Sequence, residues 1–149
     1  MVDEAARKAR IAEILEAQRF AVLATVGAEG PYTSLVAFTA ADDLRSVLFA
    51  TLRTTRKYAY LAASGAVSLL IDTRSGTGSD FEDAEAVTVL GRATDVPEEE
   101  RADAVRRHVG RHPELEDFLS SPLCALVRVE VERYLLVSRF REAQVVEMR

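Results

Sequence analysis

The connections between the first apolar segments of the chain are short, and this limits the fold more than any other feature. Residues 20–26 and 32–39 are apolar or β-branched, and only a Gly- and Pro-containing turn at residues 27–31 separates them. A second short link at residues 41–45 leads to another apolar segment at residues 46–51. Parallel strands need a crossover of about a dozen residues or more, so these links favour antiparallel neighbours. The sequence therefore argues against a doubly wound parallel sheet.

Helices are predicted mainly between later strands. Within residues 3–19, Ile11, Ile14 and Leu15 have the spacing of one helical face, and Asp3 is a favourable N-cap. Capping residues and prolines predict three more helices, at residues 56–63, at residues 97–109 and shortly after Pro113. Apolar or alternating runs predict further strands at residues 67–72, 86–94, 127–131, 134–140 and 143–148.

Length and composition indicate one soluble domain over residues 1–149. A chain of 149 residues suffices for one core, and the single cysteine, Cys124, rules out an internal disulfide. The fold class expected is mainly β: an antiparallel barrel or curved sheet of about six to seven strands with helices outside. The net charge of −5 lacks the basic character of a nucleic-acid-binding surface. No apolar run suits a membrane span, and the acidic N-terminus does not resemble a signal peptide, so a cytoplasmic location is expected.

Residues 51–57 concentrate groups that can bind a phosphate. The hydroxyls of Thr51, Thr54 and Thr55 and three cations lie between a predicted strand end and a predicted helix start. Unpaired backbone N–H groups at a helix start favour an anion. A solvated, capped helix start has the same composition, so spacing alone leaves both interpretations open.

Several sequence blocks resemble, in order and spacing, the FMN-binding split-barrel family of pyridoxamine 5'-phosphate oxidase-like proteins. The blocks cover nearly the whole chain: residues 21–25 (AVLAT), 30–36 (GPYTSLV), 51–57 (TLRTTRK), 67–70 (VSLL) and 89–93 (VLGRA). Residues 111–114 and 134–143 resemble the haem-utilisation branch of this family, in particular its single-domain relatives. The resemblance implies a split β-barrel with FMN as cofactor.

The resemblance also implies the residues of a flavin site. Three residues of the second strand would border the flavin, largely through main-chain contacts, and four residues near the third strand would hold the ribityl phosphate. They are Ser34, Leu35 and Val36, and Thr51, Thr55, Arg56 and Lys57. The family is dimeric, so a homodimer with the cofactor between subunits is expected. The partner's fifth strand or C-terminal segment would close the site, with Arg139 and Phe140 as candidates in the latter.

Two functions from different classes are consistent with these residues. One is an FMN-dependent oxidoreductase acting on an unidentified small substrate, in which the cofactor supplies the chemistry. The other is a non-catalytic flavin- or haem-binding protein on the same fold. Thr39 stands where the family's namesake oxidase has a lysine, and no histidine follows His112. We therefore expect no oxidation of pyridoxamine 5'-phosphate.

Other candidate groups favour structural roles. His108 and His112 are four residues apart, but Gly110 and Pro113 interrupt the helix, so no metal site is expected. Cys124 has apolar neighbours and is predicted to be a small buried residue. Asp80, Glu82 and Asp83 lie in the polar segment 73–83, which predicts a mobile loop with solvated charges.

Overall fold

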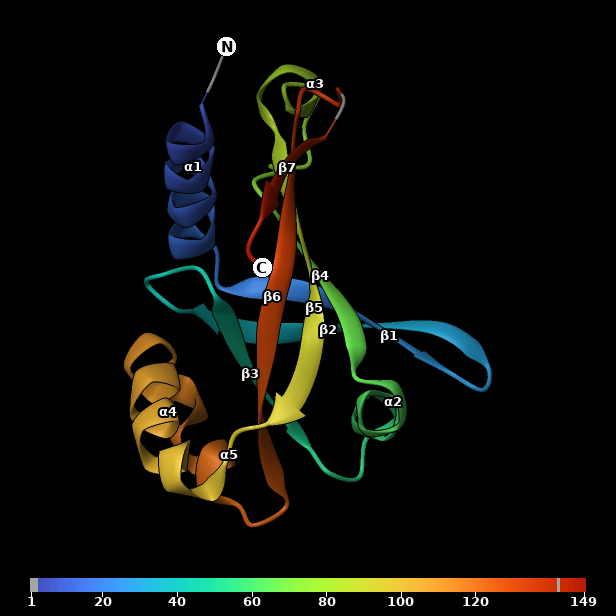
Figure 1. Ribbon diagram of the computed structural model, residues 1–149, viewed down its shortest axis with the longest axis vertical. Helices are drawn as coiled ribbons and strands as arrows, with labels where there is room; N and C mark the ends of the chain where they lie inside the picture. Colours follow the sequence, from blue (N-terminus) through green and yellow to red (C-terminus); the bar gives the residue numbers. More distant parts are fainter. Residues whose placement is uncertain (1–2, 142) are drawn as a thin grey trace.

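The sheet closes on itself into a six-stranded antiparallel barrel (Figure 1). The computed structural model describes residues 3–141 and 143–149. The strands are paired in the order β3–β2–β1–β4–β5–β6, and β3 also pairs with β6. This confirms the predicted mainly β, antiparallel architecture. Their bounds are β1 (Phe20–Gly27), β2 (Gly30–Ala40), β3 (Ser46–Leu52), β4 (Ala66–Asp72), β5 (Glu85–Asp95), β6 (Cys124–Ser138) and the additional β7 (Gln144–Glu147), which pairs with β6.

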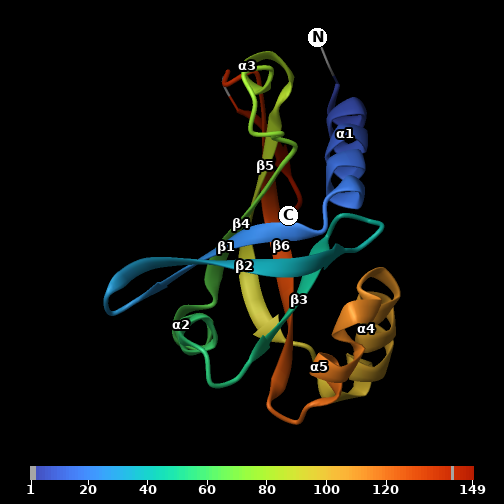
Figure 2. The same ribbon diagram turned by 180° about the vertical axis from the view of Figure 1, so that it is seen from behind.

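The helices lie outside the barrel (Figures 1 and 2). Asp3 caps α1 by accepting a hydrogen bond from the backbone N of Ala6, and Thr55 caps α2 in the same way through Tyr58. Among the described helices, none is long and apolar enough to cross a membrane. Their bounds are α1 (Glu4–Ala17), α2 (Arg56–Ser64), α3 (Asp80–Asp83), α4 (Glu98–Arg111) and α5 (Glu116–Ser120), with a 3-10 turn at Pro113–Leu115.

Side chains alternate along each strand, so that every second side chain fills the interior of the barrel and the side chains between them lie on the outer face. Leu23, Phe38 and Phe49 are fully buried, and so are the inward valines of β5 and β6. Burying one such side chain stabilises the fold by roughly 1.5–3 kcal/mol. Ile11 and Leu15 of α1 join the same core, as their helical spacing predicted. The side chains between these inward positions therefore remain available for a site on the outer face.

The segments predicted as two strands, residues 127–131 and 134–140, form the single strand β6. Leu90 pairs with Arg133 but Gly91 pairs with Val131, so β6 carries one extra residue at this bulge. A Cβ at Gly91 would lie 2.3 Å from the carbonyl oxygen of Glu130, which explains the glycine. The predicted end at residue 140 was wrong, because residues 139 and 140 have positive φ angles and leave the strand.

Two buried histidines attach α4 to β2. Nδ1 of His108 lies 2.8 Å from Oγ1 of Thr39, and Nε2 of His112 donates to the carbonyl of Phe38 at 2.7 Å. Arg111 donates to backbone carbonyls at the C-terminal end of α1, so α4 also holds that helix. The described residues contain no group of three or more His, Cys, Asp and Glu side chains that could bind a metal. Through these hydrogen bonds the buried histidine pair packs α4 onto β2.

The environment of His108 predicts a loss of stability in mild acid. Burial, followed by the neighbouring His112 and Arg111, lowers the pKa of His108 from 6.5 to about 4. Between these values the unfolded chain binds a proton that the folded protein excludes, so stability falls as pH falls. From pH 7 to pH 5 this residue should reduce the free energy of unfolding by about 2 kcal/mol. Urea denaturation of the wild type and His108→Asn across this range measures it, and an equal pH slope in the variant would contradict the assignment.

Candidate functional site

A pocket of about 440 Å³ lies on the outer face of β2 and β3, beside the start of α2. Leu35 and Ala37 point into it because Val36 and Phe38, the alternate residues of β2, fill the barrel. Further apolar walls come from β1, β3, the 3-10 turn and α5, through Phe20, Ala50, Leu52, Leu115 and Phe118. One end is polar and is formed by Thr51, Thr55 and Lys57.

The threonine hydroxyls at the polar end are bonded to each other. Oγ1 of Thr51 lies 2.9 Å from Oγ1 of Thr55, which donates to the carbonyl of Leu52 at 2.9 Å. The backbone N of Tyr58 in turn donates to Oγ1 of Thr55, which completes the cap of α2. Lys57 makes no ion pair with any residue that the structure describes. The ammonium group, the hydroxyls and the start of α2 together favour an anion at this end.

Five of the seven predicted site residues line this pocket: Leu35, Val36, Thr51, Thr55 and Lys57. Ser34 is directly opposite the core residue Leu23, and its Oγ is buried without a hydrogen-bond partner in the described part of the chain. The side chain of Ser34 does not line the pocket.

Arg56 lies away from the pocket, toward the β1–β2 hairpin. Its guanidinium is 3.3 Å from Oε2 of Glu29 and 5.4 Å from the centre of the Tyr32 ring. Both members of this ion pair are largely exposed, so the pair is worth about 1 kcal/mol or less. Glu29 therefore competes only weakly with any anion that approaches the guanidinium of Arg56.

Arg53, the third cation of this segment, belongs to a separate cluster. Its Nη1 is 2.9 Å from Oδ2 of Asp95 and 2.8 Å from Oη of Tyr58, and that hydroxyl donates to Asp95 at 3.0 Å. The hydrogen bond to Asp95 raises the pKa of Arg53, while burial and then Asp95 raise the pKa of Tyr58. Of the three cations counted in the sequence, only Lys57 lines the pocket.

Thr39 lies beneath α4, at the base of a separate surface pocket. It is 8% exposed and its hydroxyl contacts His108. It lies two residues beyond Ala37 on β2 but does not line the pocket. Position 39 therefore supplies no cation to the pocket.

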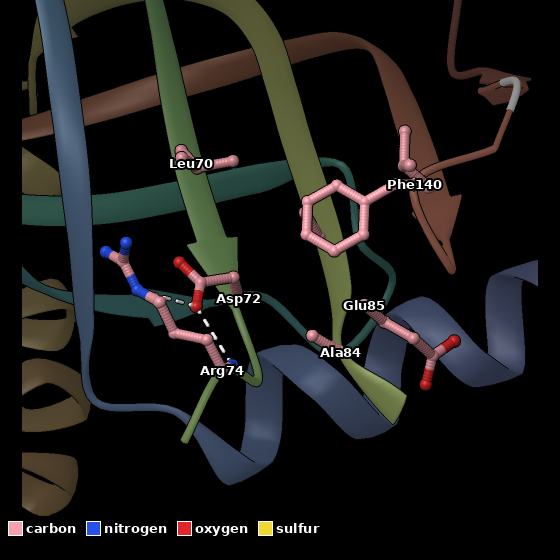
Figure 3. A pocket seen from close by; sticks show the side chains of 8 residues that line it. Leu70, Asp72, Arg74, Ala84, Glu85 and Phe140 are labelled. Carbon is pink, nitrogen blue, oxygen red and sulfur yellow. Dashed lines mark hydrogen bonds and ion pairs between the residues drawn. The ribbon is translucent and has the colours of Figure 1, made fainter. Parts of the chain in front are cut away.

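A second, smaller pocket of about 230 Å³ lies where β4, β5 and β6 reach the far end of the barrel (Figure 3). Leu70, Ala86 and Val137 form its apolar part, with Phe140 over β5. Asp72 and Arg74 form an ion pair of 3.1 Å at its other side. Phe140 is largely exposed and its ring centre is 5.8 Å from that of Phe81.

The fold and this arrangement define a split β-barrel with a pocket on its outer face, and comparison with known proteins shows its family. A family model described as "Pyridoxamine 5'-phosphate oxidase" matches residues 8–138. The chain therefore belongs to the pyridoxamine 5'-phosphate oxidase family, as the sequence blocks indicated. Comparison with curated proteins gives no significant match.

Solved structures share this fold at low sequence identity. A haem binding protein from Mycobacterium smegmatis has a TM-score of 0.79 and 19% identity over 91% of this chain and 56% of its own. Campylobacter jejuni ChuZ has a TM-score of 0.82 and 11% identity over 97% of this chain and 61% of its own. A FAD-binding protein, mll6688 from Mesorhizobium loti, has a TM-score of 0.68 and 16% identity over 86% and 91%. The chain thus spans little more than half of the first two.

Sequence analysis missed the residues that form the far wall of the pocket. Leu115 and Phe118 come from a segment about 60 residues after Thr55. A short helix after Pro113 was predicted, but nothing in the sequence placed it beside β3. The hydrogen bonds that Asp95 accepts from Arg53 and Tyr58 were also missed, because they depend on where the end of β5 lies relative to α2.

Proposed function

We propose that this protein binds FMN in the pocket between β2, β3 and the start of α2. The observation that carries the proposal is the position of Thr51, Thr55 and Lys57 at one end of an otherwise apolar pocket of about 440 Å³. A phosphate monoester suits the hydroxyls and the ammonium group, and a flat aromatic ring suits the apolar walls. FMN ends at this phosphate, whereas FAD would need room for a second nucleotide beyond it.

With flavin bound, the protein would act as an oxidoreductase on a small molecule. The cofactor would supply hydride or electron transfer. Among the described residues that line the pocket, Lys57 is the only ionisable side chain. The chain's own contribution is therefore to hold the phosphate, orient the ring system and exclude water with apolar side chains.

FMN should stabilise the protein, and Lys57 should account for much of the binding. Free FMN at about 100 times its dissociation constant adds roughly 2.7 kcal/mol to the free energy of unfolding. Lys57→Ala should weaken binding about tenfold or more, because a charged hydrogen bond contributes roughly 1.5–3 kcal/mol. Replacing Arg56 as well tests the role expected for it from the sequence; because Arg56 lies away from the pocket beside Glu29, the further loss should be smaller than that of Lys57→Ala. Thermal unfolding with and without FMN measures this, with Arg106→Ala on the exposed side of α4 as the control; no shift in the wild type would refute the cofactor assignment.

The second candidate is a protein on the same fold that holds flavin without turnover. The pocket offers no histidine or carboxylate to a reaction, which favours this alternative. It also offers no histidine, cysteine or methionine to a haem iron, so flavin is the better fit. Bleaching of bound flavin by a reduced nicotinamide, with reoxidation by an added acceptor, distinguishes the enzyme from the binding protein.

The proposed setting is the cytoplasm. The single cysteine, Cys124, is buried and unpaired, so the described fold does not depend on a disulfide. The acidic net charge of −5 favours a small-molecule partner over a nucleic acid.

We propose that two copies of the chain associate through the outer face of the sheet. In register across β2, β1, β4, β5 and β6, this face carries a row made of Leu35, Val22, Leu70, Thr88 and Leu135. Leu35 is 68% exposed and Leu70 is 38% exposed, and the row connects the pocket with the second pocket near Phe140. An apolar face of this extent is typical of an interface.

Association predicts a particle of twice the mass of one chain, which is 16.4 kDa. Light scattering at micromolar concentration should show this, since an obligate interface buries roughly 2,000 Å² or more. Leu70→Arg should shift the mass toward the monomer by placing a charge in the row. The exposed α4 variant Arg106→Ala serves as the control. A wild-type mass near that of a single chain would contradict the dimer.

The protein should not oxidise pyridoxamine 5'-phosphate at a useful rate. A second phosphate-bearing ligand needs its own cations, and each missing charged partner costs about 1.5–3 kcal/mol. Thr39 is neutral and lies beneath α4, and the histidines lie in the same buried layer. Oxygen uptake by FMN-loaded protein with this substrate measures the activity. Turnover near one per second at micromolar substrate would show that the substrate clamp lies elsewhere, with Arg139 and Arg141 the first residues to replace.

A further inference from the structure

The loop between β3 and α2, residues 53–55, carries Thr55 and joins Thr51 near the end of β3 to Lys57 in the first turn of α2. The backbone N of Arg53 donates to the carbonyl of Leu123 at 2.8 Å, and the backbone N of Thr55 donates to that of Leu52 at 3.2 Å. Arg53 and Thr54, at the tip of the loop, are exposed. Thr51 is fixed by its pairing with Ala125 of β6, whereas the positions of Thr55 and Lys57 also depend on the side chains that hold this loop and the start of α2.

Asp95 holds the loop from both sides. It accepts from Nη1 of Arg53, within the loop, and from Oη of Tyr58, in the first turn of α2. The backbone N of Tyr58 also donates to Oγ1 of Thr55. Tyr58 thus connects Asp95 to the cap of α2, and the threonine hydroxyls are bonded to each other. Asp95 is anchored independently, because its main chain pairs with Val127 of β6.

The carboxylate of Asp95 forms its ion pair with Arg53 outside the pocket. Among the described residues, Lys57 is the only cation that lines the polar end. An anion at this end therefore meets one ammonium group beside two hydroxyls that are bonded to each other, of which that of Thr55 also donates to the carbonyl of Leu52. This donor set suits a terminal phosphate monoester.

We propose that Asp95 is a positioning residue for phosphate recognition, acting through Arg53 and Tyr58 on Thr51, Thr55 and Lys57. The proposal rests on the proposed FMN function and extends it to a residue outside the pocket. Arg53 and Asp95 are each 42% exposed, and such a pair contributes little to global stability. Variants at Asp95 are consequently expected to fold, so an effect on ligand preference can be measured.

The experiment compares FMN with riboflavin, which has the same ring system and no phosphate. Dissociation constants are measured by fluorescence titration for the wild type, Asp95→Ala, Asp95→Asn and Tyr58→Phe. The matched control is Asp103→Asn, which breaks a 3.0 Å ion pair with Arg106 on the exposed side of α4. Amide hydrogen exchange over residues 52–58 reports on the loop without any ligand.

Asp95→Ala should weaken FMN binding about three- to tenfold, the equivalent of losing an ion pair and a hydrogen bond, and change riboflavin binding by less than about twofold. Asp95→Asn should lie between it and the wild type, because the amide oxygen still accepts a hydrogen bond. Exchange over residues 52–58 should become faster in Asp95→Ala and stay unchanged in Asp103→Asn.

Equal weakening of both ligands in Asp95→Ala would show a general structural effect and overturn the positioning role. Unchanged FMN binding or unchanged loop exchange in that variant would overturn it as well. A wild-type protein that binds FMN no better than riboflavin would instead overturn the proposed function, and with it any role of Asp95 in phosphate recognition. A wild-type preference that survives in Asp95→Ala overturns only the inference about Asp95.

Discussion

The pairing of β3 with β6 is the constraint on which the other features of this molecule depend. Seven residue pairs join the two strands, from Ser46 opposite Glu130 to Leu52 opposite Cys124. Without this pairing β3 would be an open edge with unpaired backbone groups. With it, the inward side chains form one enclosed core, and the end of β3 is fixed where the loop to α2 begins. The location of the polar end of the pocket therefore follows from closure of the barrel.

Closure of the barrel also separates the inner face of the sheet, which forms the core, from the outer face, which forms the pocket. Inside, buried apolar side chains form the core, and their burial is the main favourable contribution to folding. Outside, neighbouring residues of the same strands are partly exposed and form the pocket and the apolar row. Helices cover only part of the outer surface: α4 contacts β2, β3 and β6, α5 contacts β6, α2 contacts β1, and α1 lies near the far end (Figure 2). The uncovered part of the sheet is where a ligand or a second chain has access.

Local patterns were sufficient for most of the fold but not for the site. Short links, strand alternation and caps such as Asp3 and Thr55 predicted the elements, because these signals act between neighbours in sequence. They could not show that residues 127–140 contain one bulged strand, since the bulge is set by pairing with β5. Nor could they separate Lys57 from Arg53 and Arg56, which have similar chemistry and different partners. Those partners, Asp95 and Glu29, are brought near only by the folded sheet.

The histidine-lined contact between α4 and β2 also limits how this protein can diverge. Thr39 and His108 are buried together beneath the helix, and Nε2 of His108 has no hydrogen-bond partner among the described residues. A lysine at position 39 would remove the hydroxyl that contacts His108 and would add a positive charge to the surface that Thr39 shares with Arg111. A change of charge at this position of β2 is therefore coupled to the residues that α4 presents to the strand.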